Sequence, residues 1–299
     1  MAESQKIGVA GLGNMGSALA RRLLASGFSL SVFNRTPGRE APLVVRGAVS
    51  TASAAELAGK VDILLTCVPD GPDVEQLILG KGGVLAGARP GLLVVECSTI
   101  DPLVSRAVGE EVRAAGCRFA DAAVGGLPKN IDAGQGVFMV GALEPDLPIV
   151  RPVLQAMGQV VHCGPPSYGV AMKLVNNLLS QTIQAADAEA LVLGAKFGLD
   201  LQVMLKVLTA SAADNAVLRG RLPEQVMSGK YDAGFTARLA LKDQRLAHDF
   251  ASRMGVPLFA LSQTRQLLTL ALAQGRGDQS VLSVAAALED VTGAKLVKE

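Results

Sequence analysis

Short apolar runs alternate with helical patterns over the first 165 residues of the chain. Seven runs predict β-strands, because they are short, largely apolar and often β-branched; they span residues 6–10, 30–33, 62–67, 92–97, 117–124, 137–142 and 159–164. Helical patterns such as 14–26 and 102–115 lie between them. Strands that are buried on both faces and alternate with helices are typical of a doubly wound, mostly parallel sheet. We therefore expect an α/β fold for this half.

The alternation stops after residues 164–169. Residues 166–197 carry no proline after the first turn and glycine only at 169 and 194, a pattern that predicts one long helix of roughly 30 residues. Beyond it, helical patterns follow one another with glycine or proline between them. We expect an α/β domain over residues 1–165 and an all-helical domain over residues 166–299, joined by the long helix.

A Gly-x-Gly-x-x-Gly turn directly follows the first predicted strand and opens a helix. Gly11 permits a tight turn, Gly13 lets a pyrophosphate approach the backbone, and Gly16 lets the helix pack close to the sheet. The strand–turn–helix context predicts a dinucleotide-binding Rossmann domain. The alternative is a glycine-rich turn without a ligand. The residues expected to bind the cofactor here are Gly11, Leu12, Gly13, Asn14, Met15 and Gly16.

The end of the second predicted strand indicates which dinucleotide is preferred. NAD-binding sites usually carry Asp or Glu at this point, paired with the ribose 2′-hydroxyl. This chain has Asn34, followed by Arg35 and Thr36. Without a carboxylate there is no charge to repel a 2′-phosphate, and the Arg35 guanidinium suits phosphate oxygens. We expect NADP(H) to be preferred over NAD(H); the alternative is that Arg35 is a solvated surface charge.

Two further strand ends carry candidate residues, because ligands of doubly wound sheets lie beyond the carboxyl ends of the strands. Val68 and Pro69 follow one strand, where they are expected to pack against the nicotinamide end of the cofactor. Ser98 and Thr99 follow the next and place hydroxyls at the same rim. The other interpretation of this segment is helix capping, with Thr99 or Asp101 as the cap and a proline in the first turn.

The long helix carries a polar stripe. Its members share one face at spacings of four, four and three residues, and they are Lys173, Asn177, Gln181 and Gln184. A partly desolvated Lys is suited to moving a proton to or from a hydroxyl oxygen as hydride arrives at or leaves the carbon. Asn177, one turn on, would hold the same oxygen or orient the Lys. The alternatives are a solvated helix face and a polar seam at a subunit contact.

Seven segments occur in the order and spacing of one known family, and they are GLGNMG, NRT, CSTIDP, DAAVGG, HCG, KLVNNLL and LKDQRLA. From about residue 5 to 290 the chain resembles the β-hydroxyacid dehydrogenases, the family of 3-hydroxyisobutyrate dehydrogenase and tartronate semialdehyde reductase. The resemblance implies a Rossmann domain that binds NAD(P), a helical second domain, and assembly into homodimers or homotetramers. It also implies that Lys173 and Asn177 are catalytic, that Thr99 lies near the nicotinamide ribose, and that Lys242 reaches the cofactor and substrate region.

One segment departs from that family. Its substrate motif usually runs Asp-Ala-Pro-Val-Ser-Gly-Gly, whereas residues 121–130 read DAAVGGLPKN. Gly125 replaces the Ser that helps to hold a substrate carboxylate in relatives, so only the backbone N–H groups of Gly125 and Gly126 remain for that role. We expect substrate contacts from Ser98, Gly125, Gly126, Lys173 and Asn177. The expected function is NADP-dependent hydride transfer to or from a β-hydroxyacid or its semialdehyde. The alternatives are a reductase of a less polar carbonyl or imine, and a non-catalytic NADP-binding scaffold protein.

The composition indicates which kinds of ligand and partner the protein is expected to bind. The 28 Lys and Arg residues nearly balance the 27 Asp and Glu residues, which leaves a formal net charge of +1 and no sign of nucleic-acid binding. The four cysteines have no CxxC spacing, so no metal site is expected. Neither a signal-peptide core nor an apolar run long enough for a membrane span is present, and we expect a cytoplasmic enzyme with a small-molecule substrate.

Overall fold

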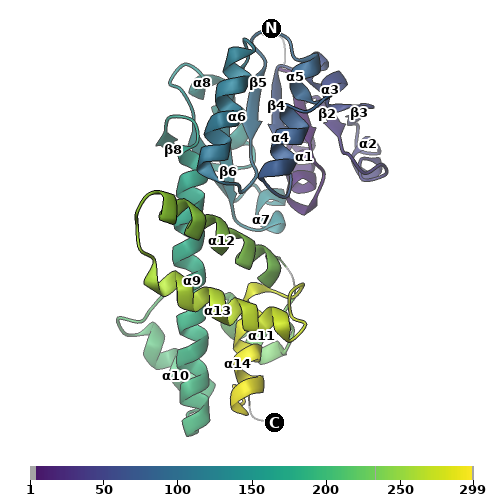
Figure 1. Ribbon diagram of the computed structural model, residues 1–299. Coiled ribbons are helices and arrows are strands. Elements are labelled where there is room, and N and C mark those ends of the chain that lie inside the picture. The colour runs from purple at the N-terminus through teal and green to yellow at the C-terminus, as the bar shows by residue number, and fades with distance from the viewer. Residues whose placement is uncertain (1–4, 233, 298–299) are drawn as a thin grey trace. The chain divides into compact units, whose positions relative to one another are not determined.

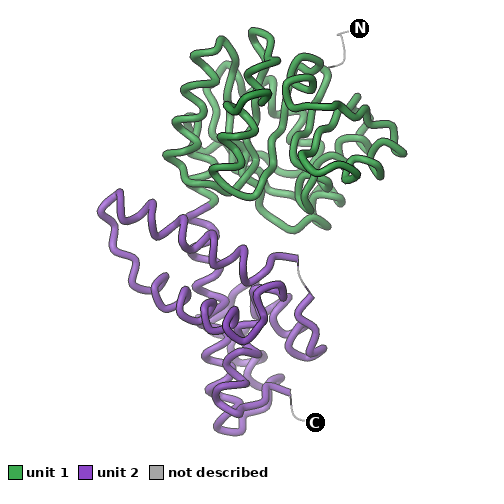
Figure 2. Tube along the Cα trace, turned by 45° about the vertical axis from the view of Figure 1, so that its right-hand side comes forward, with its two compact units in different colours: residues 1–173 green, residues 174–299 purple. Residues whose placement is uncertain are grey.

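The computed structural model describes residues 5–232 and 234–297. The chain forms two compact units, Met1–Lys173 and Leu174–Glu299, shown in two colours in Figure 2. The division falls inside one long helix, whereas the sequence interpretation ends the first domain before that helix. The first turn of the helix joins the first unit because Val170 is fully buried in the core of that unit.

An eight-stranded sheet forms the centre of the first unit, in the order β3-β2-β1-β4-β5-β6-β7-β8 (Figure 1). All neighbouring strands are parallel except β6 and β7. The strands span Ile7–Ala10, Leu30–Phe33, Val49–Ser50, Ile63–Thr66, Leu93–Glu96, Arg118–Gly125, Gly136–Gly141 and Gly158–Gly164 for β1 to β8. The predicted doubly wound, mostly parallel sheet is confirmed. The sequence pattern missed β3, because it has two residues, both exposed, and leaves no apolar run.

Helices cover both faces of this sheet because its central strands are apolar on both sides. Ile63 and Leu65 of β4 point into one buried cluster and Leu64 into the other. The first cluster lies under α1 (Asn14–Ala25), α2 (Ala41–Val44), α7 (Pro128–Asp132) and α8 (Leu147–Gln155). The second lies under α3 (Ala54–Lys60), α4 (Gly71–Ile78), α5 (Val84–Gly87) and α6 (Pro102–Ala114). The carboxyl ends of the parallel strands are left to carry loops.

Helices build the second unit around the long α9, Tyr168–Phe197. The 30 residues of α9 confirm the predicted long helix. The other helices are α10 (Leu201–Thr209), α11 (Arg221–Ser228), α12 (Ala237–Arg253), α13 (Phe259–Ala273), the short 3-10 helix η1 (Val281–Ser283) and α14 (Val284–Thr292). Their apolar faces meet in one cluster that includes Ala188, Leu222, Ala240 and Leu268. Apart from an isolated bridge between Thr236 and Ser280, the described part of this unit has no extended pairing, as the sequence predicts.

Candidate cofactor and substrate site

The turn between β1 and α1 has the shape that a pyrophosphate needs. Gly11 has a φ of 92°, a conformation that side chains disfavour. A Cβ on Gly16 would overlap the Gly11 carbonyl oxygen, so the start of α1 packs directly on the turn. Gly13 is exposed, and a Cβ there would meet nothing within 4 Å. The turn is therefore tight where it touches the protein and open where a phosphate would sit, which fits a dinucleotide. Leu12 and Gly16 are buried, Asn14 is exposed and Met15 is half-buried.

Asn34 links this turn to the loop that follows β2. Its Oδ1 accepts a hydrogen bond from the Leu12 N–H at 2.7 Å, and its Nδ2 donates to the Thr36 carbonyl oxygen at 2.8 Å. A carboxylate at this position would accept from Leu12 but could not donate to Thr36. The amide therefore shapes two segments of the candidate cofactor site at once, a role that the sequence interpretation did not include.

Arg35 lies on the surface beside α4. Its side chain is 77% exposed, and Nη1 donates to Oδ1 of Asp73 at 2.9 Å. This bond uses one of the five N–H donors of the guanidinium, so Asp73 orients the group while most of it faces solvent. Thr36 is also exposed. The segment Asn34–Thr36 thus offers a positive, solvent-facing group without a carboxylate.

Ser98 braces the loop after β4. Its side chain is buried, and Oγ accepts the Val68 N–H at 2.9 Å. The Ser98 N–H in turn donates to Oε1 of the buried Glu96 at 2.5 Å. Pro69 is exposed and Thr99 is half-buried at the same strand ends. In this structure the Ser98 hydroxyl accepts a hydrogen bond from the backbone of Val68. Its assignment to substrate binding stays a prediction.

Asp101, rather than Thr99, caps the helix that follows. Its carboxylate accepts the Leu103 N–H at 2.9 Å, and Pro102 occupies the first turn of α6. This confirms one of the two capping residues considered from the sequence.

Asp121 ties β6 to the first turn of α9. Its carboxylate accepts the Ser167 N–H and, at 2.6 Å, the Val170 N–H. Ser167 has a φ of 78°, a strained conformation for a residue with a Cβ. Burial raises the pKa of Asp121 to about 7, against the opposing effect of these backbone donors. A Cβ on Gly169 would overlap the same carboxylate, so the helix starts in close contact with the sheet.

Lys173 is the sixth residue of α9 and Asn177 lies one turn farther on. Lys173 is half-buried, whereas Asn177 is buried. In the second unit, Asn177 Nδ2 donates to Oδ2 of Asp243 on α12 at 2.7 Å. Lys242 Nζ lies 3.2 Å from Oδ1 of the same carboxylate. Two residues predicted for the site, Asn177 and Lys242, are therefore held by one acid that the sequence interpretation did not single out.

The other two residues of the polar stripe, Gln181 and Gln184, make hydrogen bonds to side chains within the second unit. Gln181 is buried and its Oε1 accepts from Nε2 of the buried Gln244 at 2.7 Å. Gln184 is half-buried and donates to Ser180 Oγ at 3.2 Å. At Asn177 and Gln181 the alternative of a solvated helix face is wrong, because both side chains are buried within the second unit.

The divergent segment 121–130 ends β6 and opens α7. Gly125 is the last residue of β6, and Gly126 is exposed with a φ of 107°. The Leu127 N–H donates to Asn130 Oδ1 at 2.9 Å, which closes the turn. Lys129 is exposed. The segment presents backbone at Gly125 and Gly126 and the half-buried apolar side chain of Leu127.

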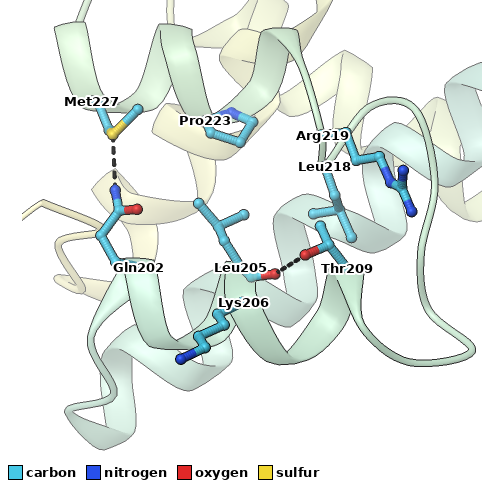
Figure 3. Close-up of a pocket in the computed structure, with 8 residues that line it drawn as sticks. All are labelled: Gln202, Leu205, Lys206, Thr209, Leu218, Arg219, Pro223 and Met227. Carbon is cyan, nitrogen blue, oxygen red and sulfur yellow. Dashed lines mark hydrogen bonds between the residues drawn. The ribbon is translucent and has the colours of Figure 1, made fainter.

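A groove elsewhere in the second unit contains none of the predicted site residues (Figure 3). It lies between α10 and the segment that leads into α11, and the bond from Gln202 Nε2 to Met227 Sδ crosses one end of it. Its lining consists of Gln202, Leu205, Lys206, Thr209, Leu218, Arg219, Pro223 and Met227. The candidate cofactor residues Gly11–Gly16 and Asn34 lie at the strand ends of the first unit, and the candidate residues Asn177 and Lys242 lie at the α9–α12 contacts of the second.

Two family models match the chain in succession. The first, described as the NAD-binding domain of 6-phosphogluconate dehydrogenase, covers residues 6–164. The second, described as the NAD-binding domain of NADP-dependent 3-hydroxyisobutyrate dehydrogenase, covers residues 167–288. The chain belongs to the β-hydroxyacid dehydrogenase family. It is thus an NAD(P)-dependent oxidoreductase whose relatives act on CH–OH groups.

Individual relatives span nearly the whole chain. It is 33% identical to 2-(hydroxymethyl)glutarate dehydrogenase of Eubacterium barkeri over 98% of both proteins. It is also 33% identical to 3-sulfolactaldehyde reductase of Escherichia coli, over 90% of this chain and 91% of that protein. The solved 3-hydroxyisobutyrate dehydrogenase of Mycobacterium tuberculosis with L-serine superimposes with a TM-score of 0.88 at 30% identity, covering 96% of this chain and 99% of that one.

The sequence held usable signals for three residues that the sequence interpretation missed. Asp121 stands among the apolar residues of 119–124, where a buried carboxylate needs donors. Asp243 and Gln244 lie on the face of α12 that also carries buried Ala240 and Ala247, at positions where apolar residues are expected. Asp73 gave no comparable signal, because an acid in the first turn of a helix is common.

The described residues contain no group of three or more His, Cys, Asp or Glu side chains arranged to hold a metal ion. No helix within the same residues is both long enough and apolar enough to span a membrane.

Proposed function

We propose that this β-hydroxyacid dehydrogenase uses NADP(H) in preference to NAD(H), and transfers hydride between the nicotinamide and a β-hydroxyacid or its semialdehyde. Lys173 is the general acid in reduction and the general base in oxidation. The observation that carries the proposal is the placement of Lys173 on the turn of α9 that follows the Asp121 anchor. That anchor belongs to β6, the strand that leads into the substrate segment 121–130.

The residues around the phosphate turn support the cofactor preference. Asn34 stands where NAD-binding sites usually carry an acid, and its amide is already used to hold Leu12 and Thr36. Arg35 offers exposed guanidinium donors for a 2′-phosphate. We expect the dinucleotide to be bound by Gly11, Leu12, Gly13, Asn14, Met15, Gly16, Asn34, Arg35, Thr36, Val68, Pro69, Thr99 and Lys242.

The proton and hydride movements balance as follows. NADPH held by the residues named above would supply the hydride that the carbonyl carbon of the substrate receives. As the C=O bond becomes a C–O single bond, the Lys173 ammonium gives a proton to the oxygen, and the hydroxyacid leaves. In oxidation, neutral Lys173 takes the hydroxyl proton while the carbon loses its hydride. Asn177 orients the reacting oxygen through its amide.

The substrate class follows from what the segment 121–130 retains. With Gly125 in place of Ser, the backbone N–H groups of Gly125 and Gly126 are the groups left there to bind a carboxylate. Ser98 is the remaining hydroxyl we assign to the substrate side, although it also braces Val68. The names of the relatives suggest the first compounds to test, namely 3-hydroxyisobutyrate, 2-(hydroxymethyl)glutarate, 3-sulfolactaldehyde and L-serine.

The test is a set of initial rates at the nicotinamide absorbance band with each of these compounds and each cofactor. We expect at least one carboxylated or sulfonated compound to turn over, with a higher kcat/KM for the NADP couple. The same panel contains uncharged ketones and cyclic imines. Turnover of those alone would instead favour the reductase of less polar substrates. NADPH binding without turnover of any compound would favour a non-catalytic scaffold protein.

We also propose that the enzyme assembles as a homodimer or homotetramer. Large apolar side chains are exposed along the end of α9 and along α10: Leu193 (74%), Phe197 (87%), Val203 (55%) and Val207 (59%). Contiguous exposed apolar groups at helical spacing support contact with a second copy of the chain. Light scattering after gel filtration tests this, and a mass of one chain at micromolar concentration would contradict it.

A further inference from the structure

The carboxylate of Asp243 stands out among the polar groups of the second unit. It is 3% exposed, and each of its oxygens has a partner from the predicted site. Oδ2 accepts from Asn177 Nδ2 at 2.7 Å, and Oδ1 lies 3.2 Å from Lys242 Nζ. Burying a carboxylate is costly unless it is paired and hydrogen-bonded, so this arrangement is maintained by strong contacts.

The chemistry of a carboxylate decides which way Asn177 faces. An ionised carboxylate only accepts hydrogen bonds, so the NH2 group of Asn177, and not its carbonyl oxygen, must point to Asp243. The Asn177 Oδ1 is then directed elsewhere, and it accepts from Asn176 Nδ2 at 3.1 Å. An Asn amide without such a partner can rotate by 180° and exchange its donor and acceptor sides.

A neighbouring pair of uncharged side chains also joins these two helices, and it serves as a comparison for Asn177 and Asp243. Gln181 and Gln244 join α9 to α12 one turn farther along by an amide–amide hydrogen bond of 2.7 Å. Within the described residues, Gln181 Nε2 and Gln244 Oε1 have no hydrogen-bond partner. If both amides rotated, the pair would make an equivalent bond in the opposite direction. That pair connects the helices but does not select an orientation.

We propose that Asp243 is a positioning residue for the reaction. Its carboxylate fixes the donor side of the Asn177 amide toward α12, keeps the Lys242 ammonium beside it, and so presents both groups to the substrate region in one arrangement. The inference rests on the proposed function, because Asn177 and Lys242 are assigned to that site there. Asp243 itself touches neither substrate nor cofactor.

The experiment compares Asp243→Asn with the matched control Gln244→Met. Asp243→Asn keeps the size of the side chain and a hydrogen bond to Asn177, but accepts either orientation of that amide. Gln244→Met removes the neighbouring cross-link between α9 and α12 and leaves the Asn177 contact intact. The measurements are the melting temperature, kcat and KM with a compound that the wild-type enzyme turns over.

The two variants are expected to separate an effect on activity from an effect on stability. Both should lower the melting temperature, because Gln244→Met leaves Gln181 without its partner and Asp243→Asn removes the charge beside Lys242. Asp243→Asn should lower kcat/KM more, on the order of 10²-fold, because a misplaced group near the reacting atoms weakens orientation. If kcat/KM falls in proportion to the loss of stability in both variants, Asp243 is only structural and the proposal is overturned.

A second measurement needs neither activity nor a variant at Asp243. The side-chain NH2 of Asn177 is observed by NMR in the wild-type enzyme and assigned by its loss in Asn177→Ser. A carboxylate-bound amide should exchange its protons with solvent at least about tenfold more slowly than the exposed Asn14. Equal exchange rates would overturn the proposal. Failure of the substrate panel would overturn the proposed function and leave this result standing.

Discussion

Three polar side chains of the first unit and two polar pairs of the second unit are held in different ways. In the first unit, Asn34 binds Leu12 N–H, Ser98 binds Val68 N–H, and Asp121 binds the start of α9. In the second unit, the Asn177–Asp243 and Gln181–Gln244 pairs join side chain to side chain. Backbone anchors shape loops, which suits a dinucleotide that binds to N–H groups. Side-chain anchors orient amides and charges, which suits a small polar substrate.

The first way to test this comparison is at Lys173, the last residue of the first unit. Lys173→Ala should lower kcat on the order of 10²–10⁴-fold, the usual scale of general acid–base catalysis, because no other group would exchange the proton. The NADPH dissociation constant should change little. Single-turnover absorbance traces give the hydride-transfer rate, and fluorescence titration gives the dissociation constant. A loss below about fivefold would remove Lys173 from the chemistry.

Arg35 tests the loop that Asn34 shapes. Arg35→Ala should lower kcat/KM for NADPH by about 10–100-fold, because charge-assisted hydrogen bonds to a phosphate contribute roughly 1.5–3 kcal/mol. The value for NADH should hardly change. Arg46→Ala is the matched control, since Arg46 is an exposed arginine at the end of the following helix. Equal losses with NADPH and NADH would contradict the NADP preference.

Substitutions at two glycines of the phosphate turn are expected to separate an effect on folding stability from an effect on cofactor binding. Gly16→Ala should lower the free energy of unfolding by about 1–3 kcal/mol, because its Cβ would overlap the Gly11 carbonyl. Gly13→Ala should change it by less than about 0.5 kcal/mol, because nothing lies within 4 Å of the new Cβ. Its NADPH dissociation constant should nevertheless rise roughly tenfold, since the methyl group keeps a phosphate from the backbone. Denaturant unfolding and cofactor titration check the pair. Unchanged NADPH affinity in Gly13→Ala would place the pyrophosphate elsewhere.

Asp121 gives an effect that is visible as a pH dependence. Burial raises the pKa of its carboxyl from 3.8 to about 7 in the folded state. The folded state therefore binds more protons than the unfolded state between these values, and stability falls as pH rises through that range. Asp121→Asn should flatten the slope by up to about 1.4 kcal/mol per pH unit. Urea unfolding of both proteins from pH 4.5 to 7.5 measures it; identical slopes would show that Asp121 does not titrate there.

Much of the first unit could be predicted from local pattern. Most strands are recognisable in the sequence as short apolar runs. Gly11, Gly13 and Gly16 lie within six residues of one another, directly after a strand. The missed features depend on distance along the chain. Asn34 meets Leu12 across 22 residues, and the antiparallel pairing of β6 with β7 depends on how the chain returns along the sheet.

The limit of what the sequence alone can predict is clearer in the second unit. Helical spacing brought Lys173, Asn177 and Gln181 onto one face, and the resemblance to the family added Lys242. Nothing in a single sequence pairs Asn177 with Asp243, which is 66 residues away on another helix. Spacing alone also left open whether the stripe was solvated or buried, because that depends on which helix packs against it.

The most direct test of the comparison is the NADPH dissociation constant of Asn34→Ala and Asp243→Asn, measured side by side by fluorescence titration. Asn34→Ala removes the acceptor of the Leu12 N–H and should raise the constant about tenfold, the effect of one or two lost hydrogen bonds. Asp243→Asn should leave it within about threefold of the wild-type value, because the substitution leaves the phosphate turn intact and reaches the cofactor only through Lys242. An equal loss of NADPH affinity in both variants would contradict the division between backbone anchors for the cofactor and side-chain anchors for the substrate.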